Sequence, residues 1–397
     1  MTPPRPHPFT RSSLAERLDR WIAAIWRKGW DEKPPLEPDY LWQIGSRGYE
    51  EADEISVRSE EDVADFRLRL EQLCQALRDE ADLNALGHTM AYGQLTSAIR
   101  KRHALGRLWR QEPELAHTTI APPIVVLGQM RSGTTRVQRL LAADPAHAGT
   151  RFCDSHDPVP STPDLRAVKS RAALVLAHWV NPWLETMHPI GATRTDEEIG
   201  WLSAALSPVA FEAQWRIPSY VAFSEARDPA PVYREFARIL RTDAAHHGNA
   251  LRPRVLKCPQ FAQDAPALLS QFPDARIVAC HRVQEDVLAS SVSMVASQMA
   301  FQSDSHELAE LQDYWRARIA QRSGRMRTFL DAFSGPVARM EFAELNHNWR
   351  AAMTSAYGDL GIGLGNRALA AMELEVDRAD SDRHREHRRQ IGAILSS

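Results

Sequence analysis

The sequence predicts an α/β fold in which helices flank a parallel sheet of the P-loop type, preceded by an N-terminal helical unit. The clearest strand signal is the continuous apolar run 124–127, which is typical of a strand buried on both faces of a parallel sheet. Helical stretches separate this run from later ones, and strands that alternate with helices indicate a parallel sheet. The first 115 or so residues show helical spacing of apolar side chains and no strand signal.

The remaining elements follow from the same patterns. Three further strands are expected at residues 254–256, 276–280 and 337–342. Helices are expected at about 12–30, 60–82, 86–109 and 305–333, with Ser59 capping the second. We therefore expect a helical N-terminal unit (1–118), an α/β core (119–376) and a charged C-terminal tail (377–397) that forms a solvated helix or loop.

Composition excludes several classes of function. The 397 residues carry a formal net charge of -3, which argues against a nucleic-acid partner or any general polyanion binder. No apolar run is long enough to span a membrane, and the N-terminus lacks the apolar stretch of a signal peptide. The four cysteines are scattered without a C-x-x-C pair, which is typical of small buried residues in a reducing cytoplasm.

The strongest local signal is the loop after the first strand, which reads Gly128-Gln129-Met130-Arg131-Ser132-Gly133-Thr134-Thr135. A strand, a glycine-bearing loop and a helix in this order point backbone N–H groups at an anion. Gly133 lets the backbone approach a ligand closely, and Thr134 and Thr135 add hydroxyl donors. The forked guanidinium of Arg131 suits an oxyanion that is held by several contacts.

This loop is not a Walker A motif. Gly128 and Gly133 have the required spacing, and Thr135 stands where a magnesium-binding residue would be, but Thr134 replaces the lysine. The substitution weakens the case for a nucleotide kinase or hydrolase. An ordinary strand–turn–helix without a ligand is the structural alternative.

Residues 123–145 resemble the 5′-phosphosulfate loop of the nucleotide-dependent sulfotransferases, P-I-x-I-x-G-x-x-R-S-G-T-T, in a bacterial branch that is also similar to the protein-tyrosine sulfotransferases. The resemblance implies that the sulfuryl donor is 3′-phosphoadenosine 5′-phosphosulfate (PAPS). It also implies that the phosphosulfate end of this donor is bound by Arg131, Ser132, Gly133, Thr134 and Thr135.

A second, distant motif supports the same resemblance. Residues 272–282 resemble the family's F-P-D-A-R-x-V-x-x-H-R strand, whose arginine is followed eight positions later by a serine. In the family this pair binds the 3′-phosphate of the donor, which implies that role for Arg282 and Ser290. Arg282 would lie at the carboxyl end of a strand, where open α/β sheets bind ligands, and Ser290 in the helix that follows. The family commonly has Asp-Pro or Asp-Gly after the arginine, whereas this chain has Val283-Gln284.

Sulfuryl transfer requires alignment of the acceptor oxygen with the leaving phosphate and stabilisation of the charge that develops. The sulfuryl group carries less charge than a phosphoryl group, so a lysine can supply this stabilisation and no metal is required. Lys257, within Arg254-Val255-Leu256-Lys257-Cys258-Pro259, resembles the lysine of the family's L-K-x-P element, which faces the transferred group. The alternative is a lysine that only extends to the surface.

A general base should accept the proton of the acceptor. The family places a glutamate four residues before a proline, and here Asp154 stands four residues before Pro158. His156 is an alternative base, since an imidazole can act at neutral pH without help. Asp154 could instead cap or turn its loop.

The cluster Asp196-Glu197-Glu198, which follows Met187-His188-Pro189-Ile190, also resembles a family feature. Acidic residues are favoured in a first helical turn on dipole grounds alone. The alternative is that the cluster binds the acceptor or supplies the base, with Glu198 as the candidate catalytic residue.

Two other functions are consistent with parts of the sequence. A P-loop nucleotide kinase or hydrolase would use the same loop, and a non-catalytic interaction protein could retain a decayed nucleotide fold. The sulfotransferase interpretation predicts a hydroxyl or amine acceptor on a small molecule, carbohydrate or lipid, which the fold alone does not specify.

Overall fold

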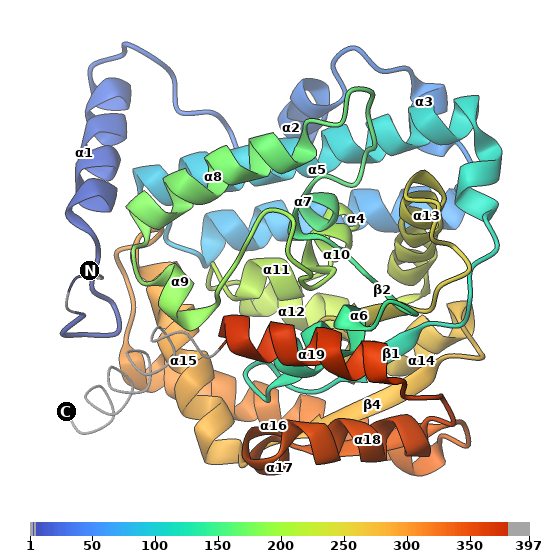
Figure 1. The fold of residues 1–397 in the computed structure, drawn as a ribbon. Helices are drawn as coiled ribbons and strands as arrows, with labels where there is room; N and C mark the ends of the chain where they lie inside the picture. The colour runs from blue at the N-terminus through green and yellow to red at the C-terminus, as the bar shows by residue number, and fades with distance from the viewer. Residues whose placement is uncertain (1–2, 4, 380–397) are drawn as a thin grey trace.

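The computed structural model describes residue 3 and residues 5–379 of the chain (Figure 1). Its centre is a five-stranded sheet in the order β2-β3-β1-β4-β5, in which all neighbours are parallel. The strands are β1 (Ile124–Leu127), β2 (Ala148–Gly149), β3 (Arg254–Lys257), β4 (Arg276–His281) and β5 (Val337–Glu341). The predicted α/β fold with a parallel sheet is therefore confirmed.

Helices make up most of the remaining chain. Those before the sheet are α1 (Ser13–Arg27), α2 (Pro38–Gly45), α3 (Glu51–Ile55), α4 (Glu60–Asp79), α5 (Ala85–Gln111) and the 3-10 helix η1 (Pro113–His117). Those between β1 and β3 are α6 (Thr134–Ala143), α7 (Phe152–His156), α8 (Arg166–Val180), α9 (Leu184–Met187), α10 (Ile199–Ala204), α11 (Val209–Glu212), α12 (Pro218–Glu225) and α13 (Ala230–His246). Later helices are α14 (Phe261–Gln271), α15 (Gln284–Ala300), α16 (Leu308–Ala332), α17 (Phe342–His347), α18 (Trp349–Asp359) and α19 (Asn366–Ala379).

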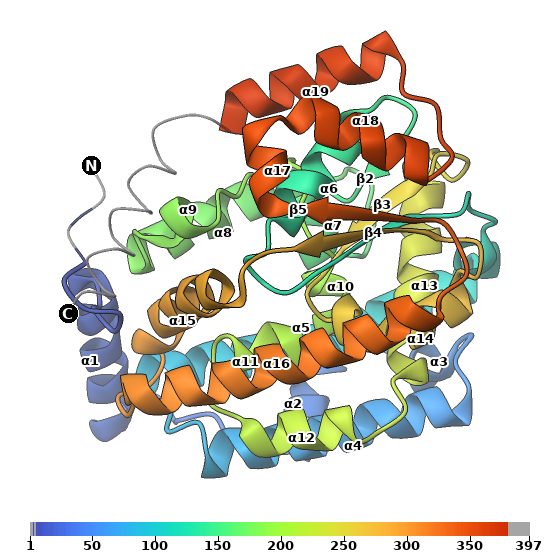
Figure 2. The ribbon, with the colours of Figure 1, turned by 90° about the horizontal axis from the view of Figure 1, so that it is seen from below.

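The central strand β1 explains why the sheet forms as it does. All four of its residues are buried, and successive side chains point to opposite faces. Val125 and Leu127 pack in the core with α13, α14 and α16, whereas Ile124 and Val126 pack with α6, α18 and α19. Figure 2 shows the sheet between these two helical layers.

The register of the sheet positions the functional residues. Val126 of β1 lies opposite Lys257 of β3, and Leu127 lies opposite Ala279 of β4. The loop after β1, the end of β3 and the end of β4 are therefore brought to the same edge of the sheet. This edge is where open α/β sheets bind ligands.

The N-terminal helices pack onto the sheet domain rather than standing apart. Leu105 and Trp109 of α5 share one hydrophobic core with Val125 and Leu127 of β1. The predicted cap of α4 is present, since Ser59 Oγ accepts a hydrogen bond from the Asp62 backbone N–H at 3.2 Å. The predicted apolar face of α4 is buried against α5 and the α10–α12 segment.

The other expectations can be compared directly. The strands at 124–127, 254–256, 276–280 and 337–342 match β1, β3, β4 and β5 to within one residue at each end. The two-residue strand β2 was not predicted. The four cysteines are buried and free, as the composition indicated. Most of the predicted C-terminal tail lies outside the described residues. None of the helices within residues 5–379 combines the length and apolar character needed to cross a bilayer.

A buried ion pair joins the N-terminal helices to α13. Arg58 donates two hydrogen bonds to Glu235, at 2.7 and 3.0 Å, and both side chains are almost fully buried. Burial would raise the pKa of Glu235, but the charges of Arg58, Arg102 and Arg238 lower it to about 2. The carboxylate is thus held ionised in the interior by the surrounding guanidinium groups.

We expect Glu235→Gln to lower the free energy of unfolding by about 3–5 kcal/mol, because it leaves buried guanidinium charge without its counter-ion. The measurement is chemical denaturation followed by circular dichroism. Glu373→Gln is the matched control, since Glu373 pairs with Arg350 at an exposed position and should cost no more than about 1 kcal/mol. Equal losses for the two variants would contradict this role for the buried pair.

Candidate active site at the carboxyl end of the sheet

The loop between β1 and α6 is folded tightly against its neighbours. Gly133 has a φ of 91°, and a side chain at this position would lie 2.4 Å from the ring of Phe342. At Gly128 a Cβ atom would lie 2.6 Å from Ser132 Oγ, so glycine is required at both positions. Gly133 caps α6, and no described residue accepts a hydrogen bond from the backbone N–H groups of Thr134 and Thr135. The first turn of α6 can therefore donate to an anion.

Arg131 connects this loop to two distant segments. Its Nε donates to Ser290 Oγ of α15 at 2.9 Å, and its Nη1 donates to the backbone oxygen of Met187 at 2.8 Å. The residue has a φ of 68°, which lies in the left-handed region that residues other than glycine rarely adopt. Strained backbone of this kind persists where the surrounding structure holds it in place, commonly at functional sites.

Arg282 lies beside Arg131 at the end of β4. Its Nη1 donates to the backbone oxygen of Arg131 at 3.0 Å, and its guanidinium lies 4.4 Å from the centre of the Phe342 ring. Desolvation, and then the charge of Arg282, lower the pKa of Arg131 to about 10. Two like charges held this close favour an anion between them or against both.

The structure thus brings together the predicted donor-site residues Arg131, Arg282 and Ser290, which are far apart in sequence. Ser290 lies about two turns into α15, as expected, although Val283-Gln284 replaces the family's turn residues. Ser132, Gly133, Thr134 and Thr135 line the same loop and the start of α6.

Lys257 ends β3 at the same edge of the sheet. Its side chain is almost buried, and its Nζ lies 2.6 Å from Glu197 Oε2. Its backbone N–H donates to Glu198 Oε2 at 2.7 Å, so the Glu197-Glu198 segment is fixed to the end of the strand. The ammonium group is therefore held by an ion pair and does not simply extend to the surface.

Glu198, a candidate base from the sequence, is fully buried beneath this contact. Burial raises the pKa of its carboxyl to about 8, against the opposing effect of the Lys257 N–H. A carboxyl without exposed surface does not reach an acceptor. The geometry favours a structural role for Glu198 in fixing the end of β3.

Asp154, the other carboxylate candidate, is enclosed by cations. Arg151 donates to both of its oxygens, Arg166 lies 3.2 Å away and His247 Nε2 lies 3.1 Å away. Burial would raise the pKa of Asp154, but these partners hold it well below its ordinary value. A weakly basic carboxylate with only 1% of its surface exposed is poorly suited to accept a proton. Its burial and its cationic partners weigh against the predicted base role of Asp154. The sequence pattern on which that prediction was based does not include these partners.

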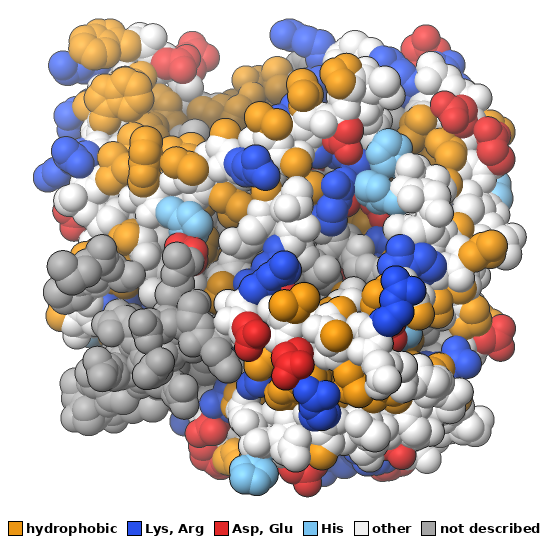
Figure 3. All heavy atoms as spheres, viewed as in Figure 1, with side chains coloured by type: hydrophobic (Ala, Val, Ile, Leu, Met, Phe, Trp, Pro, Cys, Tyr) orange, Lys and Arg blue, Asp and Glu red, His pale blue; other side chains and the backbone are white. Residues whose placement is uncertain are grey.

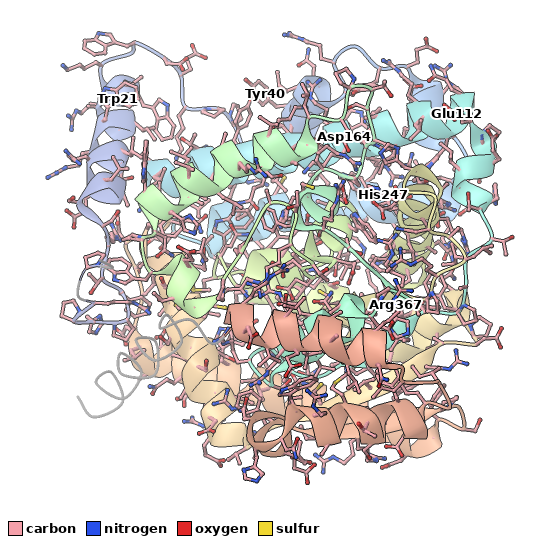
Figure 4. All side chains as sticks on the ribbon, in the orientation of Figure 1. Trp21, Tyr40, Glu112, Asp164, His247 and Arg367 are labelled. Atoms are coloured by element: carbon pink, nitrogen blue, oxygen red, sulfur yellow. The ribbon has the colours of Figure 1, made fainter. Side chains whose placement is uncertain are left out.

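The network around Asp154 continues outward. Figure 4 shows Asp164 and His247 on facing segments, the loop before α8 and the end of α13. Arg166 donates to both oxygens of Asp164, and His247 is shared between Asp154 and Asp243. Hydrogen bonds to these two carboxylates raise the pKa of His247 to about 9. This network ties α7, α8 and α13 together.

His156, the alternative base, follows on α7. Its side chain is exposed. Desolvation by neighbouring protein, and then the charge of Lys101, lower the pKa of its imidazole, and solvent at this exposed position screens both effects. His156 also packs against the ring of Phe152. It stays neutral, but its lowered basicity makes it a weaker proton acceptor than an ordinary histidine.

A histidine–aspartate pair that the sequence reasoning did not assign lies at the centre of the site. His188 Nε2 lies 3.0 Å from Asp196 Oδ1, and Asp196 is buried with Arg139 at 3.6 Å. Burial would raise the pKa of Asp196, but His188, Arg139 and Lys257 hold it below its ordinary value. His188 directly follows Met187, whose backbone oxygen accepts from Arg131. The nearby Glu197 contacts Lys257, so the pair lies between the two cationic elements of the site.

Two groups of side chains within the described residues have donor atoms close enough for a metal ion, and they are Asp154, Asp243 and His247, and His188, Asp196 and Glu197. Protein cations already contact both groups. Arg151 and Arg254 reach the first, and Arg139 and Lys257 reach the second. A divalent cation would have to displace these side chains.

A surface cavity of about 400 Å³ lies at the opposite edge of the sheet, beside Pro123 and Asp274, which precede β1 and β4. It shares no residue with the loop after β1. Ligands in open α/β sheets bind at the carboxyl ends of the strands, so the cluster around Arg131 remains the candidate site.

Comparison with known proteins agrees with this geometry. The model of the sulfotransferase family matches residues 122–365. No curated protein matches the chain. The solved structure of sulfotransferase STF1 from Mycobacterium tuberculosis H37Rv is 25% identical, with a TM-score of 0.77, covering 87% of this chain and 94% of that one. Sulfotransferase STF9 from Mycobacterium avium, at 19% identity and a TM-score of 0.75, covers 89% of this chain and 90% of that one and shows the same fold.

The family match covers more than half of the chain and contains the loop after β1, Lys257, Arg282 and Ser290. Together with the shared fold, it shows that this chain belongs to the sulfotransferase family.

Proposed function

We propose that the chain transfers a sulfuryl group from PAPS to a hydroxyl or amine of a small molecule, carbohydrate or lipid. The observation that carries the proposal is the convergence of Arg131, Arg282 and Ser290 beside the N-terminus of α6. Three cationic or hydroxyl donors and a helix N-terminus at one sheet edge suit a ligand with more than one phosphate or sulfate group.

The donor would be held at two ends. The backbone N–H groups and hydroxyls of Thr134 and Thr135, with the close approach that Gly133 allows, would bind the 5′-phosphosulfate. The N–H and hydroxyl of Ser132 both donate to the Gln129 backbone oxygen, so Ser132 would shape the loop unless it turns toward the ligand. Arg282 and Ser290 would bind the 3′-phosphate. Arg131, which contacts Ser290 and lies against Arg282, would bridge the two and lose its repulsion from Arg282 when an anion binds.

In the proposed in-line step the acceptor oxygen or nitrogen forms a bond to sulfur while the bond from sulfur to the 5′-phosphate oxygen breaks. The leaving oxygen gains negative charge, which Lys257 is positioned to stabilise from the end of β3. Glu197 holds the Lys257 ammonium in place through the 2.6 Å contact. The acceptor proton must pass to a base on the opposite side of the sulfur.

We infer that His188 is this base. Asp196 accepts a hydrogen bond from its Nε2, which fixes the tautomer and leaves the Nδ1 lone pair for the acceptor proton. The carboxylate also stabilises the imidazolium that forms. Of the three candidates from the sequence, Asp154 and Glu198 are less suited because they are buried, and Asp154 is also paired with cations. His156 is exposed and less suited because the pKa of its imidazole is lowered.

The donor assignment predicts that 3′-phosphoadenosine 5′-phosphate binds about tenfold to a hundredfold more tightly than 5′-AMP, because a charged hydrogen-bond pair contributes roughly 1.5–3 kcal/mol. Arg282→Gln should remove most of this preference. Isothermal titration calorimetry measures both affinities, with the exposed Arg316→Gln on α16 as the matched control. Equal affinities for the two nucleotides in the unmodified chain would refute the 3′-phosphate site, and a magnesium-dependent preference for ATP would favour a kinase.

Lys257→Met should separate binding from chemistry. The ammonium acts mainly on charge that develops in the transition state, so the single-turnover rate should fall by roughly two orders of magnitude or more. The affinity for 3′-phosphoadenosine 5′-phosphate should change only severalfold. The acceptor for this assay is identified first, by mass spectrometry of a cell extract incubated with donor and protein. A variant that binds nucleotide poorly but transfers at the normal rate would rule out this role.

The base assignment predicts a contrast between two substitutions. His188→Gln should lower the single-turnover rate by about 10²–10⁴ with little change in donor affinity, the usual effect of removing a general base. Asp154→Asn should retain transfer within about an order of magnitude while lowering stability, since it weakens the network with Arg151 and Arg166. The reverse pattern would make Asp154 the base, as the sequence motif suggested.

A further inference from the structure

Helix α8 buries an arginine and exposes most of its large apolar side chains. Its buried residues are Arg166, Ser170 and Leu174, which repeat at every fourth position. Arg166 reaches inward to Asp154 and Asp164. This arrangement inverts the usual pattern, in which the apolar stripe of a surface helix faces the core.

The outward stripe follows regular helical spacing. Leu165, Val168, Val175, Leu176 and Trp179 have between 49% and 64% of their surfaces exposed, and the exposed Ala172 continues the spacing. Such a stripe in contact with water is unfavourable unless something covers it, and contiguous exposed apolar surface commonly marks an interaction site.

The stripe continues onto α1. Ser12 Oγ, at the start of α1, donates to the backbone oxygen of Val180 at the end of α8. Trp21 of α1 is 62% exposed. Figure 3 shows hydrophobic side chains gathered over α1 and the adjoining end of α8 on one face, and Figure 4 places Trp21 there. We call Trp21, Leu165, Val168, Val175, Leu176 and Trp179 the α1–α8 face.

Basic residues accompany this face. Lys169 and Arg171 are exposed on α8, and residues 165–180 contain no aspartate or glutamate. On α1, Arg17 and Arg20 are exposed within one turn of Trp21. Tryptophan and aliphatic side chains together with lysine and arginine are the composition of helices that lie in the interface of an anionic bilayer. The local positive charge contrasts with the net charge of -3 for the whole chain.

We propose that the α1–α8 face docks on an anionic lipid surface. A second copy of the chain fits the face less well, because pairing two α8 helices would bring Lys169 and Arg171 of both copies together without an acidic partner in either helix. α8 is also held rigidly from beneath by Arg166, so docking requires no rearrangement of the helix.

The docking helix is linked along the chain to the candidate site. α8 continues through α9 to Met187 and His188, whose segment contacts Arg131 and Asp196. The acceptor side of the site is therefore connected to the docking helix by a few residues.

The test is co-sedimentation of the full chain with phosphatidylcholine vesicles, with and without phosphatidylglycerol. Binding is expected only when phosphatidylglycerol is present and should weaken with added salt.

The double variant Val175→Ser, Trp179→Ser should lower the partition coefficient by on the order of tenfold or more. The control is Leu251→Ser, Leu374→Ser, which removes two exposed apolar side chains elsewhere (84% and 61% exposed) and should bind as the unmodified chain does. In the double variant Lys169→Glu, Arg171→Glu, phosphatidylglycerol should no longer increase the fraction of protein that sediments with the vesicles.

Circular dichroism of each variant separates loss of binding from loss of folding. Failure of the unmodified chain to sediment with either vesicle, or equal partition of the Trp179 and Leu374 double variants, would overturn the proposal. The face would be assigned to a second copy instead if the chain does not bind vesicles but forms a concentration-dependent dimer in size-exclusion chromatography. Only the Val175→Ser, Trp179→Ser variant should then disrupt this dimer. These outcomes do not depend on sulfuryl transfer, so they test the docking face separately from the proposed activity.

Discussion

The electrostatic constraint on which the site depends is the closeness of Arg131 and Arg282 at the carboxyl edge of the sheet. The parallel register of β1 and β4 brings the two residues together, and the Arg282 guanidinium donates to the Arg131 backbone. Desolvation, and then the charge of Arg282, lower the pKa of Arg131, and an anion bound against both guanidinium groups would relieve their repulsion. The strained backbone of the loop, the glycines at 128 and 133 and the buried Ser290 hold this arrangement in place. Within the protein Arg282 pairs with Asp286 at 3.3 Å in a solvent-exposed position, and a polyanionic ligand would add its negative charge to this balance.

The other charged residues near the site divide into two groups according to their partners. Asp154 and Glu198 are committed to structure, the first by three cations and the second by the backbone of Lys257 beneath the sheet edge. Glu197 and Asp196 instead orient groups that face the site, Lys257 and His188. Neighbouring carboxylates thus serve different purposes because their hydrogen-bond and ion-pair partners differ. The same logic explains α8, whose inward Arg166 completes the Asp154 network and leaves the apolar residues of the helix in water.

The sequence predicted those features whose signals are local. The apolar run of β1, the cap at Ser59 and the strand at 276–280 depend on neighbouring residues, and the loop and Arg282–Ser290 motifs have fixed spacing. β2 was missed because two residues carry no period. The sequence pattern favoured Asp154 as the base because its partners Arg166, on α8, and His247, at the end of α13, are not part of that pattern. His188 did have a signal, a histidine just before the acidic cluster, but only the fold shows that it pairs with Asp196. The exposed stripe of α8 has the pattern of a buried helix, so sequence alone does not reveal its inversion.

The most direct test of this account is a crystal structure of the chain with 3′-phosphoadenosine 5′-phosphate. The account predicts the 5′-phosphate at the backbone N–H groups of Gly133 to Thr135, with the 3′-phosphate in contact with Arg282 and Ser290. Lys257 should face the 5′-phosphate from the end of β3, and His188 should lie across the open side of that phosphate. A nucleotide bound at the opposite edge of the sheet, in the cavity beside Pro123 and Asp274, would contradict the account. So would a 5′-phosphate that leaves the first turn of α6 without a ligand.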